Sequence, residues 1–241
     1  MMKKIIIIGF VLLFVSAVYG IDPPPPEPGV DILVAPLTAD FGMVPSGSTS
    51  LPVSFTIKNT GTFGDLIISS LIVNSTAFSV QSYNCTVLPI TLNNTCTFDV
   101  VFAPSSSGVM SATVSITSND PDAPVINIPL SGEGTVPDIL VADPSLPYDD
   151  LILSFGDITE GNSLTKTVGV TNIGKADLTI ASVGQNDPLA APFSFALDGC
   201  TEMTLAPNQL CEINVTFSPV STGPFSDTFD IVSNDPDEAS V

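Results

Sequence analysis

One pattern of cysteine and apolar residues occurs twice in this chain and constrains its fold more than any other feature. The segments Cys85–Pro104 and Cys200–Pro219 both follow C-x10-C-x5-F-x-P, and apolar and polar residues alternate after the second cysteine of each. Because successive side chains of a β-strand point to opposite faces, each segment predicts a half-buried strand with a cysteine at its inner start. The inward positions are Cys96, Phe98, Val100 and Phe102 in the first copy, and Cys211, Ile213, Val215 and Phe217 in the second.

The duplication extends well beyond these segments. Asp31-Ile32-Leu33-Val34 returns as Asp138-Ile139-Leu140-Val141, Phe41-Gly42 as Phe155-Gly156, Asn59-Thr60-Gly61 as Asn172-Ile173-Gly174, and Ser118-Asn-Asp-Pro-Asp122 as Ser233-Asn-Asp-Pro-Asp237. The offset between copies varies from 107 to 115 residues while the motif order holds, which places the insertions in loops. We therefore expect two domains of ordinary size, residues 31–134 and residues 135–241.

Short alternating segments separated by turn residues fill each repeat, and no stretch has a helical period. In repeat one the alternation is clear in Val53–Lys58 and Met110–Thr117. Asn119–Asp122 has the residues of a tight turn, and Pro129 marks an edge or the end of a closing strand. Seven or eight such strands per repeat predict an all-β fold of tandem immunoglobulin-like β-sandwiches.

The ordered motifs D-I-L-V, F-G, N-T-G, C-x-F-x-V-x-F-x-P, S-N-D-P-D and P-L-S-G-E-G resemble the hydin/abnormal-spindle (ASH) type of immunoglobulin-like domain. They are most similar to the secreted bacterial form known as the choice-of-anchor D repeat. The resemblance covers Asp31 to the end, and it implies a sandwich related to the major sperm protein fold that serves scaffolding or adhesion. Eukaryotic relatives are ciliary or centrosomal, which implies an alternative location in the cilium and cytoplasm.

The N-terminus has the features of an export signal. Lys3 and Lys4 precede the apolar run Ile5–Val18, which has the length of a signal sequence and is short for a membrane span. Residues 1–20 are therefore predicted to be a signal peptide of a secreted or cell-envelope protein, with an uncleaved anchor as the alternative. No second span is expected. Residues 21–30 contain five prolines, which predict an extended stalk or a ligand for a proline-binding domain.

The charge of the chain excludes several functions. It has 25 acidic and 5 basic residues, no histidine, and no arginine. Such a surface repels phosphate backbones, so we expect protein partners or neighbouring immunoglobulin-like repeats and no nucleic acid. The usual general base and the usual oxyanion or phosphate clamps are missing, so we expect no enzymatic activity and no cofactor.

The cysteines and aspartates are the candidate site residues. Two identically spaced cysteine pairs in an exported chain predict the disulfides Cys85–Cys96 and Cys200–Cys211, each stabilising by about 3 kcal/mol in the chain-entropy model. The alternative, a zinc site, would need both pairs to converge from separate domains. Asp120, Asp122, Asp235 and Asp237 are weak calcium candidates, as is the Asp149-Asp150 pair, although turn geometry explains the repeated N-D-P-D motif equally well.

Four N-x-T or N-x-S triplets match the glycosylation acceptor and matter only in a eukaryotic host. They begin at Asn74, Asn84, Asn93 and Asn214.

Repeat two ends differently from repeat one. Repeat one closes with Val125–Gly134, whereas repeat two keeps the motif to Asp237 and ends at Val241, so we expect no residue matching Ile126 or any later position. A strand at Phe225–Ser233 would then have unpaired backbone groups and an uncovered core face, which is a template for another strand. Either the chain is a fragment of a longer protein or repeat two accepts a strand from a partner. In both cases repeat two is expected to be the less stable domain.

Overall fold

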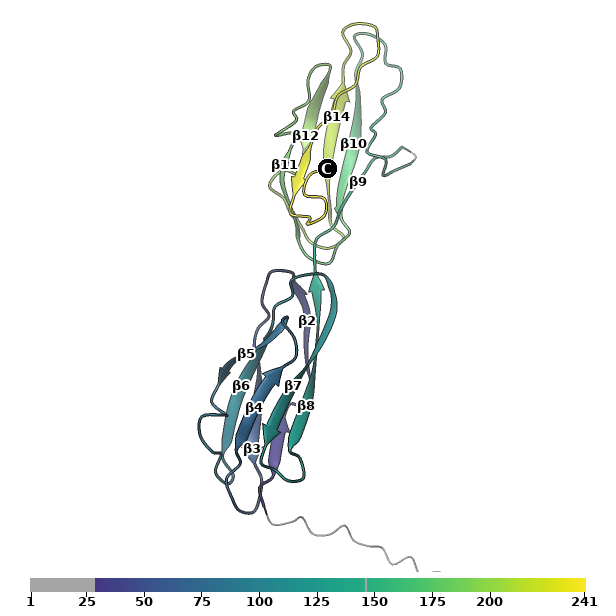
Figure 1. Ribbon diagram of the computed structural model, residues 1–241. Coiled ribbons are helices and arrows are strands. Elements are labelled where there is room, and N and C mark those ends of the chain that lie inside the picture. The colour runs from purple at the N-terminus through teal and green to yellow at the C-terminus, as the bar shows by residue number, and fades with distance from the viewer. Residues whose placement is uncertain (1–28, 146) are drawn as a thin grey trace, which may run out of the picture.

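The computed structural model describes residues 29–145 and 147–241. The predicted signal peptide, and the predicted stalk up to residue 28, lie outside the described residues. The described chain contains fifteen strands and no helix, which confirms the all-β prediction. Figure 1 shows two sandwiches, one after the other along the chain.

Repeat one is a complete two-sheet sandwich with strands in the orders β1-β3-β6-β5 and β2-β8-β7-β4. The first sheet contains β1 (Ile32–Ala35), β3 (Val53–Asn59), β6 (Thr95–Phe102) and β5 (Phe78–Tyr83). The second contains β2 (Ala39–Pro45), β8 (Val125–Thr135), β7 (Gly108–Ser118) and β4 (Ile68–Val73). All neighbouring strands are antiparallel except β2 and β8, which are parallel.

The core of repeat one forms where the alternation predicts it. The four inward side chains of β6 are at most 6% exposed, and Phe98 stacks on Phe55 of β3 with ring centroids 4.9 Å apart. Burying one large apolar side chain stabilises the fold by about 1.5–3 kcal/mol. The same alternation on β7 and β8 buries Ile116 and Ile128 completely, which closes the core from the opposite sheet.

Pro129 lies inside β8 without breaking the sheet. β7 pairs with β8 from Gly108–Gly134 to Thr117–Val125, whereas β2 pairs with β8 only from Leu130 onward. Pro129 therefore lies where β8 is still an edge strand on the β2 side, and its missing N–H costs no hydrogen bond there.

Repeat two has one complete sheet and one reduced sheet. The complete sheet has the order β12-β14-β10-β9, formed by β12 (Phe193–Asp198), β14 (Leu210–Phe217), β10 (Leu164–Asn172) and β9 (Ile139–Ala142). The other holds only β13 (Thr204–Leu205), β11 (Leu178–Val183) and β15 (Ile231–Ser233). Among the described residues, no strand of repeat two corresponds to β2 or β8.

Two expectations about the end of repeat two are wrong. The strand expected at Phe225–Ser233 is only Ile231–Ser233, because no described strand of repeat two pairs with residues 223–230 as β8 pairs with β7 in repeat one. Ile126 also has a counterpart, since the constant offset of 115 residues over this stretch matches it to Val241. The N–H of Val241 donates to the Ile231 carbonyl at 3.0 Å, and the N–H of Ile231 donates back at 2.8 Å. This pair reproduces the Ile116–Ile126 pair of repeat one.

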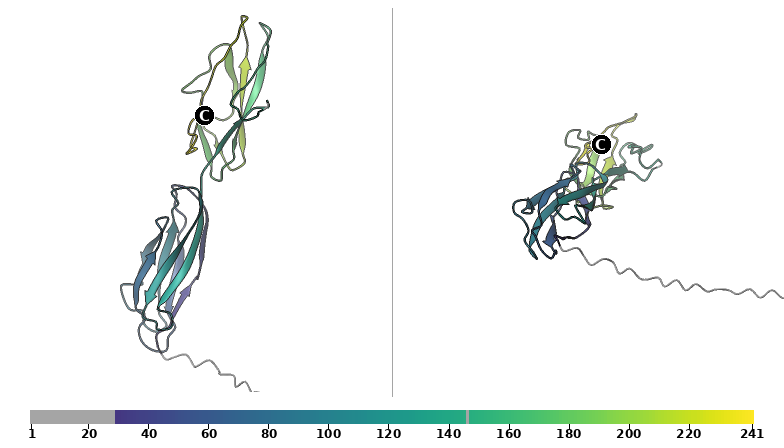
Figure 2. Two further views of the ribbon diagram at one scale, coloured as in Figure 1. Left: turned by 45° about the vertical axis from the view of Figure 1, so that its right-hand side comes forward. Right: turned by 60° about the horizontal axis from the view of Figure 1, so that its bottom comes forward.

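A short segment joins the repeats, which lie end to end in Figure 1 and in the left-hand view of Figure 2. The carbonyl of Val136 accepts the N–H groups of Lys175 and Ala176, which attaches the segment to repeat two. Lys175 Nζ also lies 2.6 Å from Glu133 Oε1, forming an ion pair between the repeats. The Lys175 side chain is 64% exposed, so this pair contributes at most about 1 kcal/mol.

Candidate functional site

Both cysteine pairs form disulfides within their own repeats. Cys85 is joined to Cys96 with Cα atoms 5.1 Å apart, and Cys200 to Cys211 with Cα atoms 5.3 Å apart. Each bridge links the inner start of β6 or β14 to the loop before it and is almost completely buried. All four cysteines of the sequence are used in this way, so none is left to bind zinc.

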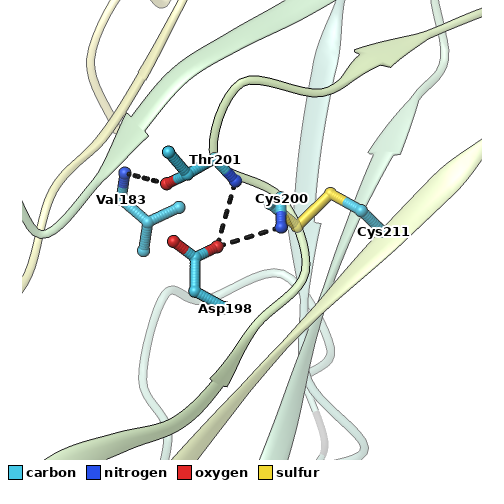
Figure 3. Close-up of a disulfide and its surroundings, with 5 residues drawn as sticks. All are labelled: Val183, Asp198, Cys200, Thr201 and Cys211. Carbon is cyan, nitrogen blue, oxygen red and sulfur yellow. Dashed lines mark hydrogen bonds between the residues drawn. A yellow bond between two sulfur atoms is a disulfide. The ribbon is translucent and has the colours of Figure 1, made fainter.

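A carboxylate organises the loop beside the second disulfide (Figure 3). Asp198 Oδ1 accepts the N–H groups of Cys200 at 2.9 Å and Thr201 at 3.0 Å, and Thr201 Oγ1 accepts the N–H of Val183. Partial burial acts to raise the pKa of Asp198. The hydrogen bonds from Thr201 and Cys200 outweigh it and hold this pKa below its ordinary value.

The aspartates considered as calcium ligands have other partners. Asp120 is 1% exposed, and its Oδ2 accepts the N–H of Ile32 at 2.8 Å while its Oδ1 accepts the N–H groups of Asp122 and Ala123. Asp235 makes the equivalent bonds in repeat two. These carboxylates connect the first strand of each repeat to the S-N-D-P-D turn in which the aspartate lies.

Asp122 and Asp237, the second aspartates of the two N-D-P-D motifs, are exposed and donate only their backbone N–H groups to this arrangement. Asp149 and Asp150 are exposed as well. Carboxylate oxygens of Asp138, Asp235 and Glu238 lie within 4.8 Å of one another. Both oxygens of Asp235 already accept backbone N–H groups, so this cluster is explained without an ion. Calcium binding stays an untested expectation.

Sequence reasoning missed the role of the asparagine in each N-x-G motif. Asn59 is fully buried; its Nδ2 donates to the carbonyls of Gly64 and Ile90, and its Oδ1 accepts the N–H of Gly61. Asn172 makes the same kinds of bond in repeat two. The asparagine recurs at the end of an apolar strand in both repeats, and this recurrence is the sequence signal that points to a structural role.

A large concavity in repeat two is lined by the inner side chains of the complete sheet and by residues 151–158 and 221–229. It has a volume of about 880 Å³, and its floor is aromatic and aliphatic. Phe217 stacks on Phe193 with ring centroids 4.7 Å apart, and Phe155 lies 5.7 Å from Phe217. Phe225 continues the cluster at 5.8 Å from Phe217 and is 37% exposed. We call this concavity the open groove.

Repeat one contains the same aromatic cluster in closed form. Phe102 stacks on Phe78 at 4.6 Å, and Phe41 lies 6.2 Å from Phe102. Here β8 covers the cluster, and Gly132 of β8 lies directly against the Phe102 ring. The open groove therefore occupies the place that β8 fills in repeat one.

The rim of the open groove is acidic. Four carboxylate side chains line it, and no lysine or arginine does. Asp143 Oδ2 is buried and has no hydrogen-bond partner among the described residues. The lining carboxylates are Asp143, Asp157, Glu160 and Asp227.

No helix in the described ranges is long and apolar enough to cross a membrane.

Comparison with known proteins agrees with the two-sandwich architecture. A family model described as HYDIN/CFA65/VesB-like, Ig-like domain matches residues 32–133 and 144–241. No curated protein sequence matches the chain. The two matched ranges correspond to the two sandwiches.

The solved structures that match this chain have low sequence identity to it. A protein of unknown function from Porphyromonas gingivalis W83 is 12% identical over 87% of this chain and 95% of its own, with a TM-score of 0.34. The ASH/PapD-like domain 7 of human CEP192 is 16% identical over 49% of this chain and 95% of its own, with a TM-score of 0.38. The secreted serine protease VesC from Vibrio cholerae is 10% identical over 84% of this chain and 49% of its own, with a TM-score of 0.35.

Proposed function

We propose that this chain, which belongs to the HYDIN/CFA65/VesB-like family of Ig-like domains, is a non-enzymatic structural or adhesion module of the cell surface or extracellular space. The family assignment confirms the ASH-type resemblance. The observation that carries the proposal is the pair of buried disulfides at equivalent positions of two consecutive sandwiches. Such bridges persist in oxidising compartments and are rare in the cytosol.

The surface chemistry supports the same function. With 25 acidic residues and neither histidine nor arginine, the chain carries negative charge that favours solubility, and it lacks histidine, the most frequent general acid–base residue. Two consecutive sandwiches joined by a short segment are suited to the role of a spacer.

The location is tested by expressing the full-length chain with its leader and separating cytoplasmic, envelope and external fractions. The proposal expects external or envelope protein whose mass lacks the leader and whose thiols are all oxidised. Removal of the protein by protease added to intact cells distinguishes surface display from release. Reduced protein retained in the cytoplasm would contradict the proposal and favour an intracellular scaffold.

The structural role is tested separately by adherence. Cells displaying the chain are compared with cells displaying the Asp120→Ala, Asp235→Ala double variant. This variant keeps the rest of the sequence but loses the carboxylates that hold each sandwich together. Equal adherence of the two strains to each other and to host surfaces would remove adhesion from the proposal and leave a spacer.

A further inference from the structure

The connection between the two repeats contains no residue that is free of both sandwiches. Thr135, the last residue of β8, is 3% exposed, and its carbonyl accepts the N–H of Ser46 at 2.8 Å within repeat one. The next residue, Val136, is already held by repeat two, because its carbonyl accepts the N–H groups of Lys175 at 3.0 Å and Ala176 at 3.1 Å. The chain therefore passes from one sandwich to the other across a single peptide bond.

Repeat two holds the residues that follow in a backbone clamp. The N–H of Ile173 donates to the carbonyl of Asp138 at 2.8 Å, which adds to the two bonds accepted by Val136. A Cβ at Gly174 would lie 2.5 Å from Asp138 N and 2.6 Å from the Val136 carbonyl oxygen, so this close approach requires glycine. We call residues 136–138 together with residues 173–176 the joint clamp.

A proline restricts the backbone torsions that remain in the joint clamp. Pro137 has a fixed φ, and the residue before a proline is restricted to extended conformations, so Val136 is restricted as well. Few rotations are therefore left between Thr135, held by repeat one, and Asp138, held by repeat two. Bending the connection would break backbone hydrogen bonds to one sandwich or the other.

Repeat one has the same kind of clamp before its own first strand. The carbonyl of Gly29 accepts the N–H of Thr62 at 2.9 Å, and the carbonyl of Asp31 accepts the N–H of Thr60 at 2.8 Å. A Cβ at Gly61 would lie 2.2 Å from the Gly29 carbonyl oxygen. The clamp is therefore a feature of the repeat, and in repeat two it holds the chain directly after the end of repeat one.

Side chains contribute little to the connection between the repeats. Ile173, which lies in the joint clamp, is 51% exposed and is not covered by repeat one. The Lys175–Glu133 ion pair joins solvent-exposed groups, so salt screens it. Domains joined through a small side-chain interface move relative to each other by default, so stiffness at this connection has to come from the backbone.

We propose that the joint clamp makes the connection rigid, so that the two sandwiches form one stiff rod of fixed relative orientation (Figure 1). The proposal rests on the spacer function proposed above and adds how the chain performs it. A spacer with a flexible joint can fold back on itself, whereas a rigid rod keeps its two ends apart.

The test uses the oxidised, isotope-labelled full chain and measures backbone residual dipolar couplings and amide relaxation in both repeats. A rigid rod aligns and tumbles as one body, so the expected result is that one alignment tensor fits the couplings of both repeats. Raising the salt concentration should leave the shared tensor unchanged, because the bonds of the joint clamp join neutral backbone groups.

Two changes at the joint should release the rod. A Gly-Gly-Ser insertion between Thr135 and Val136 keeps the bonds to both sandwiches but adds free residues. It should give the repeats separate alignment tensors and shorten the rotational correlation time of each by about twofold, since each then tumbles as a single domain. Gly174→Ala should also separate the tensors, because its methyl group displaces residues 136–138 from the joint clamp.

The matched control is Gly61→Ala. This change places the same kind of obstruction against the Gly29 carbonyl but lies away from the joint, so it should leave the shared tensor intact. If Gly174→Ala fails to fold, the insertion variant still decides the question, because it leaves every residue of the joint clamp in place.

Separate tensors for the two repeats of the unmodified chain would overturn the proposal, as would a shared tensor that persists in the insertion variant. A shared tensor in folded Gly174→Ala would show that the joint clamp is not the cause of stiffness, which also overturns it. Failure of the rod and failure of the proposed function are distinguishable. A flexible joint in exported, oxidised protein refutes only the rod, whereas a shared tensor in protein that stays reduced in the cytoplasm refutes only the location.

Discussion

Replacing Asp120 by alanine should destabilise repeat one without affecting repeat two. The carboxylate accepts the N–H of Ile32 across 88 residues of sequence at 2.8 Å, in a buried site, and two further N–H groups of its own turn. Hydrogen bonds to a charged group contribute about 1.5–3 kcal/mol each, but the turn donors regain water when the carboxylate is removed. The buried Ile32 donor does not, so the expected loss is about 2–4 kcal/mol.

Urea unfolding of the oxidised protein measures this loss, with tyrosine fluorescence as the probe. The chain has no tryptophan, and Tyr83 is the one tyrosine of repeat one, while Tyr148 belongs to repeat two. In a Tyr148→Phe background, Asp120→Ala should lower the midpoint by roughly 2 M for a domain of this size. The control is Asp122→Ala, whose exposed side chain accepts no hydrogen bond from residues 29–145 or 147–241 and whose loss should cost under about 0.5 kcal/mol. Equal midpoints for the two variants would refute the reasoning.

Three further predictions follow from the same structure. Peptide mapping of the oxidised protein without reductant should link Cys85 to Cys96 and Cys200 to Cys211, and links between repeats or free thiols would contradict this pairing. The lowered pKa of Asp198 means that its stabilising contribution is present above the unfolded-state pKa near 4 and is lost as the pH falls through the lower folded-state value. Asp198→Asn should therefore unfold more readily than wild type at pH 7 and equally at pH 2, as followed by circular dichroism. Gly132→Val should destabilise repeat one by about 1–3 kcal/mol, because its side chain meets Phe102, and calorimetry should find the repeat-two transition unchanged.

The sequence predicted those elements whose pattern is local. β6 and β14 follow from the alternation after Cys96 and Cys211, since burial of one face needs no knowledge of the partner strand. The two disulfides follow from equal spacing within short loops. The fold class followed from many such short segments, each with its own turn.

The elements that were missed depend on residues far apart in sequence. The sequence around Asp120 predicts a turn, but its bond to Ile32 cannot be inferred without the sandwich that brings the two residues together. Phe225 and Phe229 alternate as a strand would, yet they form none because pairing needs a neighbour that residues 29–145 and 147–241 do not supply to repeat two. The position of Val241 was recoverable from the sequence, because the offset of 115 residues is constant from Gly108–Gly223 onward.

The difference between the closed and the open sandwich is tested most directly by residue-resolved hydrogen exchange of the oxidised, monomeric chain. Residues 108–117 of β7, which pair with β8, should exchange at least about a hundredfold more slowly than residues 223–230, which pair with no strand of the described chain. Equal protection of the two matched segments, in a monomer without added peptide, would show that repeat two closes without a counterpart of β8 and would contradict the existence of an open groove.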